Sequence, residues 1–209
     1  DYCKIEYGGG NGLGNICFNT SSGIIKNSTI TNSCSSGIHL TSSNPIINNG
    51  TFSNNAGYGI YGSSSLSTIT NNNFISNGSY VVSIEANCAS GLGINTAVGN
   101  IVDGIELRGV EMGYSTTWPY TTLPYIVTGD INIAEGMSGE TATLTIQPGV
   151  EVRFEQGIGI SVSSDSRRFG AINAQGTEEL PVIFTSNAAV PQAGDWKGIY
   201  FGDTTNDSL

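Results

Sequence analysis

Positive charge is scarce in this chain. Seven lysines and arginines stand against 17 aspartates and glutamates, so the formal net charge at pH 7 is -10. A nucleic-acid-binding surface needs clustered basic side chains, and the one adjacent basic pair here is Arg167-Arg168. We therefore expect no nucleic-acid partner, and a solvated loop at that pair.

Long apolar runs are missing as well. No stretch of about 18 apolar residues occurs, so the sequence predicts no transmembrane helix. The chain begins at Asp1 without a signal peptide. We expect either that a leader was removed or that this is an excerpt of a longer polypeptide. The acidic, Lys-poor composition favours an extracellular or cell-surface protein.

What the chain has in quantity is repetition. Three segments of 22 residues follow one another from Ser22, Asn44 and Leu66 and align without gaps. Their apolar residues share three columns: Ile25, Ile47 and Ile69; Ile30, Phe52 and Phe74; and Ile38, Ile60 and Val82. A fixed period in this range indicates a solenoid, whose units stack because one unit cannot bury its apolar face alone.

The pattern within each unit favours strands. Short runs such as Thr29-Ile30-Thr31 alternate polar and apolar residues, which places one face inward and the other outward. Gly, Asn and Ser separate the runs and supply turn conformations. We therefore predict an all-β fold, a parallel β-helix (β-solenoid) with about 22 residues per coil in the N-terminal half and no capping helix.

Asparagine is the second repeated feature. Asn27, Asn49 and Asn71 form one polar column, and Asn32 and Asn54 form another. Stacked side-chain amides donate and accept hydrogen bonds along the axis of the coils, which satisfies polar groups that would otherwise be buried unpaired. We predict Asn ladders at these two columns.

The C-terminal half carries a different set of motifs. They are LTIQPGV (Leu144–Val150), AQGT (Ala174–Thr177), PVIFTS (Pro181–Ser186) and GDWKGIYF (Gly194–Phe201). These motifs resemble secreted right-handed parallel β-helix proteins of the pectin-lyase-like superfamily, and the resemblance covers essentially the whole chain. It implies right-handed coils and a cell-surface context. It implies no particular activity, because the class includes many surface and structural proteins.

We expect one β-helix domain over residues 1–209. Residues 1–88 are expected to form regular Asn-ladder coils, 89–125 an irregular loop and excursion, and 126–209 β-rich coils. Trp118–Tyr125 is expected to leave the coils laterally, since its two prolines cannot donate hydrogen bonds to a ladder.

The two ends of the chain are in register with each other. Written end against start, Leu209 lies five residues before Ile5, the spacing that separates Ile25 from Ile30. Uncapped solenoid ends expose strand edges that recruit partners. We predict a head-to-tail homopolymer, in which the C-terminal coil stacks on the N-terminal coil of the next chain. The predicted assembly seam comprises Leu209, Tyr2, Cys3, Ile5, Ile199 and Phe201.

Residues that carry chemistry are few. His39 is the single histidine and is expected to face solvent, and no carboxylates share a column between Ser22 and Ala86. Asp195 is expected to be a turn residue. The sequence therefore predicts no catalytic residue, no cofactor and no metal site. One alternative stays open, in which Asp203, Asp207 and Glu6 meet across the seam and bind Ca²⁺ through oxygen ligands.

Two functions follow from these patterns. The first is a non-enzymatic structural subunit of an extracellular filament, sheath or surface layer. The alternative is a carbohydrate-binding or carbohydrate-cleaving surface module whose aromatic side chains stack on sugar rings. The candidate sugar-stacking residues are Trp118, Tyr120, Tyr125 and Trp196.

Cysteines and glycosylation sequons complete the candidate sites. Cys3 is expected to point inward with Ile5, which leaves Cys17, Cys34 and Cys88 as disulfide candidates whose pairing stays open. Sequons occur at five asparagines, of which those in expected turns are candidates to carry glycans. The three candidates are Asn19, Asn77 and Asn206, while Asn27 and Asn49 fall in a ladder column.

Overall fold

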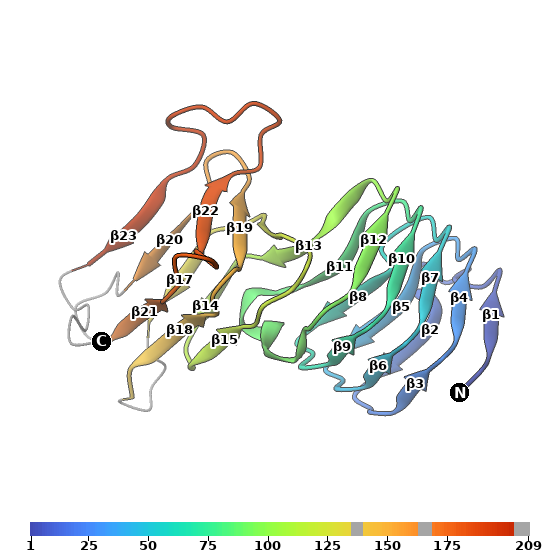
Figure 1. The fold of residues 1–209 in the computed structure, drawn as a ribbon. Helices are drawn as coiled ribbons and strands as arrows, with labels where there is room; N and C mark the ends of the chain where they lie inside the picture. Colours follow the sequence, from blue (N-terminus) through green and yellow to red (C-terminus); the bar gives the residue numbers. More distant parts are fainter. Residues whose placement is uncertain (135–139, 163–168, 203–209) are drawn as a thin grey trace. The chain divides into compact units, whose positions relative to one another are not determined.

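The computed structural model describes residues 1–134, 140–162 and 169–202. These residues form an almost entirely β structure of parallel strands, with one 3-10 helix, η1 (Ala86–Gly91), among them (Figure 1). The contacts divide the molecule into two compact units. The first is Asp1–Glu106 with Thr121–Leu123, and the second is Leu107–Tyr120 with Pro124–Leu209.

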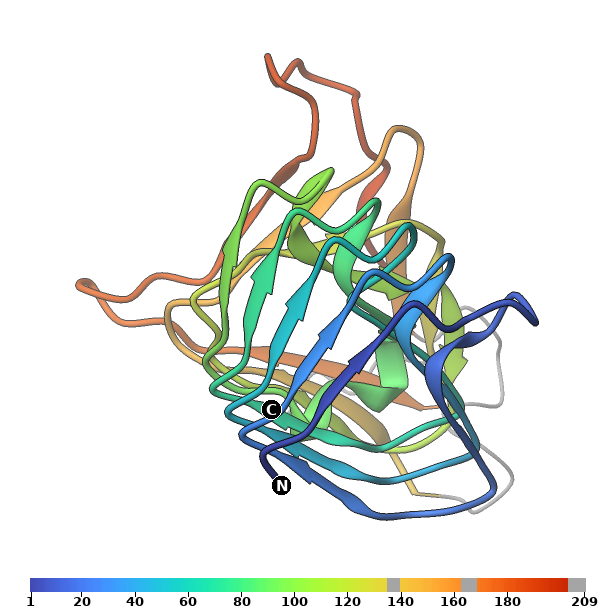
Figure 2. The ribbon, with the colours of Figure 1, turned by 90° about the vertical axis from the view of Figure 1, so that its right-hand side faces the viewer.

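The first unit is a coil with three sides, each a stack of parallel strands (Figure 2). Stack A consists of β1 (Lys4–Glu6), β4 (Thr29–Thr31), β7 (Thr51–Ser53), β10 (Asn73–Ile75) and β12 (Thr96–Val98). Stack B consists of β2 (Gly14–Asn19), β5 (Ser36–Thr41), β8 (Ile60–Ser63), β11 (Tyr80–Glu85) and β13 (Val102–Arg108). Stack C consists of β3 (Ile24–Lys26), β6 (Ile46–Asn48) and β9 (Thr68–Thr70).

The predicted columns and period are confirmed by the strand registers. Ile30 lies beside Phe52, which lies beside Phe74, and Ile38 lies beside Ile60. All five side chains are completely buried, and the Phe52 and Phe74 rings stack with their centroids 5.0 Å apart. Like residues therefore pack on like in a continuous core, as the repeat required.

The corners of the coil correct the predicted Asn ladders. Asn27, Asn49 and Asn71 have φ of 50°, 54° and 55°, and Asn32 and Asn54 have φ of 52° and 53°. These asparagines are therefore left-handed turn residues, a conformation that Asn adopts at lower cost than most residues. The sequence does show the column, but the side chain that forms the ladder is one residue further along.

The ladders are formed by Asn55, Asn77 and Asn100 at one corner and by Asn72 and Asn95 at the next. Asn55 Nδ2 donates to Asn77 Oδ1 at 2.9 Å, and Asn77 Nδ2 donates to Asn100 Oδ1 at 2.7 Å. Asn72 Nδ2 donates to Asn95 Oδ1 at 3.1 Å. Each of these asparagines also donates to a main-chain carbonyl of the core strands. The amides thus satisfy buried backbone groups while linking successive coils.

One left-handed corner position holds a residue poorly suited to it. Tyr7 has φ of 61° and is 76% exposed, in the column that Asn32 and Asn54 occupy in later coils. We expect Tyr7→Asn to raise the free energy of unfolding by about 0.5–1 kcal/mol, because Asn adopts this conformation more easily. Chemical denaturation followed by circular dichroism measures the change. Tyr114→Asn, at a 78% exposed tyrosine without positive φ, should show no such gain.

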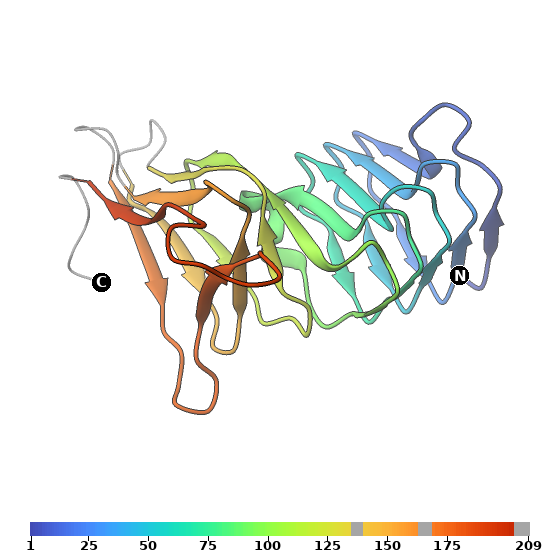
Figure 3. The same cartoon turned by 90° about the horizontal axis from the view of Figure 1, so that it is seen from above.

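The second unit is also built from three stacks (Figure 3). Stack D consists of β14 (Val110–Met112), β17 (Ile131–Ile133), β20 (Gly159–Val162) and β23 (Gly198–Phe201). Stack E consists of β15 (Thr116–Trp118), β18 (Ala142–Ile146) and β21 (Gly170–Ala174), and stack F of β16 (Tyr125–Val127), β19 (Glu151–Phe154) and β22 (Ile183–Ser186). Strands of stacks D, E and F follow one another in sequence order as those of stacks C, A and B do in the first unit.

The expected lateral excursion at Trp118–Tyr125 is wrong. Trp118 ends β15 and Tyr125 begins β16, and both side chains are completely buried. Their rings lie 5.9 Å apart, and the Tyr125 hydroxyl donates to the Pro119 carbonyl at 2.9 Å. The two prolines lie at the corner between the strands, where no ladder donor is needed.

Candidate functional site

The first coil of the described residues has a strand neighbour on one side only. β1, β2 and β3 each end their stack among the described strands. The inward side chains of these strands are only partly covered, whereas the residue beside each of them in the next coil is completely buried. The partly covered residues are Ile5, Ile16, Phe18 and Ile25, and their buried neighbours are Ile30, Ile38, Leu40 and Ile47.

The last described coil has a matching edge, where β21, β22 and β23 end their stacks among the described strands. Phe201 is 53% exposed, while Val162 beside it is completely buried. The other inward side chains of this edge are half-buried against neighbours that are at most 1% exposed. They are Ile172, Phe184 and Ile199, beside Leu144, Val152 and Ile160.

The predicted seam residues that the structure describes fall at these two edges. Cys3 is exposed and precedes β1, and its main-chain N–H donates to Ser28 Oγ at 3.1 Å. Tyr2 is 82% exposed. Leu209 lies outside the described residues, as do Asp203 and Asp207 of the alternative calcium site.

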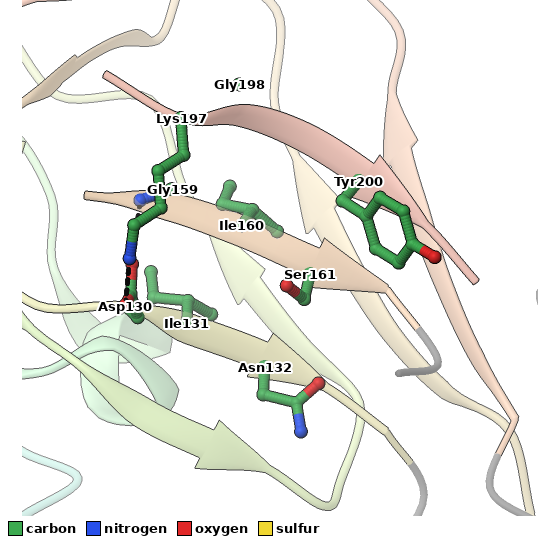
Figure 4. A pocket seen from close by; sticks show the side chains of 9 residues that line it. All are labelled: Asp130, Ile131, Asn132, Gly159, Ile160, Ser161, Lys197, Gly198 and Tyr200. Atoms are coloured by element: carbon green, nitrogen blue, oxygen red, sulfur yellow. Dashed lines mark hydrogen bonds and ion pairs between the residues drawn. The ribbon is translucent and has the colours of Figure 1, made fainter. Parts of the chain in front are cut away.

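A hollow of about 300 Å³ lies on the outer face of stack D (Figure 4). Two glycines in register, Gly159 and Gly198, lie at its floor. The Lys197 side chain covers Gly159, whereas the space over Gly198 is open. Asn132, Ser161 and Tyr200 form the neighbouring outward column, since each lies beside the next on adjacent strands. The hollow therefore reaches the open edge at β23.

An ion pair closes one side of this hollow. The Lys197 ammonium contacts the Asp130 carboxylate, and Asp130 Oδ1 also accepts the Gly159 N–H at 3.0 Å. The hydrogen bond from Lys197 is the main cause that lowers the pKa of Asp130 below its usual value. The described lining of the hollow holds one carboxylate, already paired with an ammonium, which differs from the two-carboxylate arrangement of glycoside hydrolysis.

The family follows from sequence comparison. Residues 1–122 match the right-handed β-helix region, and residues 111–206 match the pectate-lyase-like β-helix domain. The chain belongs to the right-handed β-helix family. No curated protein and no solved structure matched it. Pectate-lyase-like β-helix domains commonly belong to secreted or surface proteins, and proteins with this fold are often enzymes.

Three further observations concern the candidate metal site and membrane-spanning helices. Among the described residues there is no group of three or more His, Cys, Asp or Glu side chains arranged to hold a metal ion. Glu6, named for the calcium alternative, forms an ion pair with Lys4 at 2.7 Å. In the same described part of the protein, no helix has the length and apolar character to cross a membrane.

His39 is half-buried on the outer face of stack B. Its ring lies 5.0 Å from the Tyr61 ring, and the Tyr58 ring lies 5.4 Å from Tyr61. Partial burial lowers the pKa of the His39 imidazole. This aromatic row was not predicted, although the 22-residue period places Tyr61 directly after His39 in one column.

The aromatic residues predicted for sugar stacking are mostly structural in this β-helix. Trp118 and Tyr125 are completely buried. Trp196 is half-buried and stacks on Phe154 with ring centroids 4.3 Å apart. Only Tyr120 of the four is exposed, at 41%. They therefore do not form a platform for a sugar chain.

The structure joins none of the disulfide candidates Cys17, Cys34 and Cys88 in a disulfide. Cys17 and Cys34 are exposed, but Cys88 is buried in η1 rather than placed in an exposed turn. Small buried thiols are ordinary core residues, and Cys88 is one of these.

One glycosylation candidate is wrong. Asn77 is 2% exposed, and its Nδ2 donates to the Phe52 carbonyl and to Asn100, so it belongs to a ladder and offers no free amide to a glycan. Asn19 is exposed at the end of β2 and stays a candidate. Asn206 lies outside the described residues.

Asp195 is a turn residue, as predicted, and organises the loop of residues 187–197. Its Oδ2 accepts the Gln192 N–H at 2.8 Å and the Ser186 hydroxyl at 2.7 Å. These two hydrogen bonds, the first of them the larger cause, lower the pKa of Asp195 below its ordinary value of 3.8. Their stabilising effect is therefore complete above pH 3.8 and is lost as the pH falls through the lower folded-state pKa.

We expect Asp195→Ala to speed proteolytic cleavage within residues 187–197 several-fold at neutral pH, because the turn loses both hydrogen bonds. The wild-type loop should become comparably sensitive only below pH 3.8, where pepsin serves as the probe. Mass spectrometry of the fragments locates the cut. Val190→Ala, at a 72% exposed residue of the same loop, is the matched control, and equal cleavage of both variants would contradict the assignment.

The hollow on stack D is the feature that sequence reasoning missed. Its signal was present, because Gly159-Ile160-Ser161 and Gly198-Ile199-Tyr200 share a Gly-Ile start. In coils of unequal length that likeness does not predict register, and only the paired strands place Gly198 beside Gly159.

Proposed function

We propose that this protein is a non-enzymatic structural β-helix subunit of an extracellular filament, sheath or surface layer, which assembles end to end. The observation that supports the proposal is that, among the described residues, inward side chains of the first and last coils are partly exposed although the same columns are buried one coil further in, so that one more coil on either side would cover them. An uncovered edge of this kind presents both main-chain hydrogen-bonding groups and apolar side chains to a partner.

A second copy is the partner that supplies the required surface. Stacking the C-terminal coil of one chain on the N-terminal coil of the next repeats the coil-on-coil contact found within each unit. Each new strand pair adds main-chain hydrogen bonds worth about 1 kcal/mol net apiece. Such a contact joins two different surfaces, so it builds a filament, or a ring if it closes.

The experiment is negative-stain electron microscopy with sedimentation velocity on the purified protein. The wild type should form end-to-end polymers. We expect Ile5→Lys to weaken association at least about 100-fold, because stacking would bury an unpaired charge at a cost of several kcal/mol.

Thr29→Lys is the matched control, since Thr29 lies on the outer side of β4 in the same stack and should leave assembly unchanged. Dispersed wild-type monomers at high concentration would overturn the proposal. So would cleavage of polygalacturonate by such monomers, since this would favour a carbohydrate-cleaving module.

A further inference from the structure

We propose that the Asn ladders protect the corner asparagines of the first unit from deamidation, and that Asn49 becomes a modification site when its ladder bond is removed. This inference is independent of the proposed assembly. It rests on hydrogen bonds between coils inside the first unit.

Four corner asparagines of this unit share one arrangement. Each has positive φ, and the main-chain N–H of the next residue donates to the side-chain oxygen of a ladder asparagine. The corner asparagines are Asn32, Asn49, Asn54 and Asn71. The donors that follow them, with their acceptors, are Ser33 to Asn55 at 3.0 Å, Gly50 to Asn72 at 2.8 Å, Asn55 to Asn77 at 3.2 Å and Asn72 to Asn95 at 2.9 Å.

The nitrogen of each of these N–H groups is the atom that deamidation requires. In that reaction the main-chain nitrogen after an asparagine attacks the side-chain carbonyl carbon, Cγ. A bond from nitrogen to Cγ forms, the bond from Cγ to Nδ2 breaks, and ammonia leaves with the proton that the main-chain nitrogen gives up. Water then opens the resulting succinimide at either carbonyl and leaves aspartate or isoaspartate.

The ladder bond opposes the first step of this reaction. It directs the N–H toward the neighbouring coil, and so holds the nitrogen away from the attack on Cγ. Loss of the proton would also leave a negatively charged nitrogen against the lone pairs of a carbonyl oxygen. At Gly50 that oxygen belongs to Asn72, which is 1% exposed, so water would not relieve the repulsion.

Asn49 is the corner where this protection has the largest effect. Its side chain is exposed, and it is the one asparagine of the four that a glycine follows. Glycine has no Cβ, so the Gly50 nitrogen can approach a neighbouring group more closely than that of another residue. The Asn49–Gly50 step is therefore the most reactive of the four once its hydrogen bond is lost.

The acceptor for Gly50 is itself held in place. Asn72 Nδ2 donates to the Ile47 carbonyl at 3.0 Å and to Asn95 Oδ1 at 3.1 Å. These two bonds fix the amide so that Oδ1 faces the Gly50 N–H. Each ladder asparagine thus protects the corner of the coil before it.

The protection also keeps the corner column uncharged. Asn27, Asn49 and Asn71 lie at the same corner of successive coils, whose strands are about 4.8 Å apart. Deamidation would place carboxylates in that column, where like charges on neighbouring coils repel each other.

The test compares Asn72→Ala with the wild type. Folded protein is incubated at mildly alkaline pH, and mass spectrometry of chymotryptic fragments locates each deamidated residue. We expect Asn49 to deamidate at least about tenfold faster in the variant, because the Gly50 N–H has lost its acceptor. Equal rates in the two proteins would overturn the proposal. So would a wild-type rate at Asn49 that is the same in the folded protein and in guanidinium chloride.

Two matched variants separate loss of the acceptor from general loosening of the coils. Asn72→Asp keeps a side-chain oxygen for the Gly50 N–H but loses the Nδ2 donor, and it should deamidate at Asn49 close to the wild-type rate. Asn95→Ala removes the next ladder amide and frees the N–H after Asn71, so it should accelerate Asn71 and leave Asn49 slow.

Circular dichroism shows whether each variant folds, and if Asn72→Ala does not, Asn95→Ala decides alone. Acceleration of Asn49 in both control variants to the rate of Asn72→Ala would overturn the proposal, since it would assign the effect to loosened coils. The same holds if Asn95→Ala left Asn71 at its wild-type rate.

Discussion

Asn77→Ala is expected to lower the free energy of unfolding by about 3 kcal/mol, because one buried amide connects three coils. Asn77 Oδ1 accepts the Asn55 N–H at 3.2 Å and Asn55 Nδ2 at 2.9 Å. Its Nδ2 donates to the Phe52 carbonyl at 3.0 Å and to Asn100 at 2.7 Å. Alanine removes all four bonds at a site that is 2% exposed, where water cannot replace them.

Guanidinium chloride denaturation, followed by circular dichroism, measures this loss. Asn54→Gly is the matched control, because Asn54 is an exposed left-handed turn residue and glycine adopts that conformation freely. The control should change stability by less than about 0.5 kcal/mol. A loss below about 1 kcal/mol for Asn77→Ala would mean that the ladder contributes no more than an ordinary surface hydrogen bond.

Phe74→Ala is expected to be still more damaging, with a loss of about 4 kcal/mol. Phe74 is completely buried in the middle of the first unit, and its ring stacks on Phe52 at 5.0 Å with 19° between the planes. Truncation leaves a cavity that neighbouring coils cannot fill, because strand spacing is held by their main-chain hydrogen bonds.

The thermal unfolding midpoint, with denaturant titration, tests this prediction. Leu66→Ala is the control, since the Leu66 side chain is 57% exposed and lies largely outside the core. It should cost less than about 1 kcal/mol. If the two variants lost equal stability, the stacked phenylalanine column would not be the core that holds successive coils together.

Repetition made part of this fold predictable. Ile30, Phe52 and Phe74 share a column in the sequence because the period is constant, and the same three residues lie side by side in the structure. The predicted columns in the second unit were fewer, because its coils differ in length. The hollow beside Gly198 could not be predicted from the sequence there, since its position depends on which strands pair.

The errors share one cause, which is that local sequence does not show which way a side chain turns at a corner. Asn54 and Asn55 are adjacent asparagines, yet Asn54 is exposed with φ of 53° and Asn55 is buried in a ladder. Asn77 was placed in a turn for the same reason. The prediction placed Trp118 and Tyr125 outside the core because of the nearby prolines. In the structure those prolines lie at a corner, and both aromatic residues belong to strands.

By itself, the sequence determined that this protein is an all-β solenoid with 22-residue coils in its N-terminal half, since a fixed spacing of apolar residues favours stacking of like on like. Its right-handedness follows from the family, not from the spacing. The tertiary structure decided which asparagines form ladders, which thiol is buried, and where Gly159 and Gly198 open a hollow. These outcomes depend on backbone conformation at corners and on pairing between distant strands, and neither is encoded in the order of neighbouring residues.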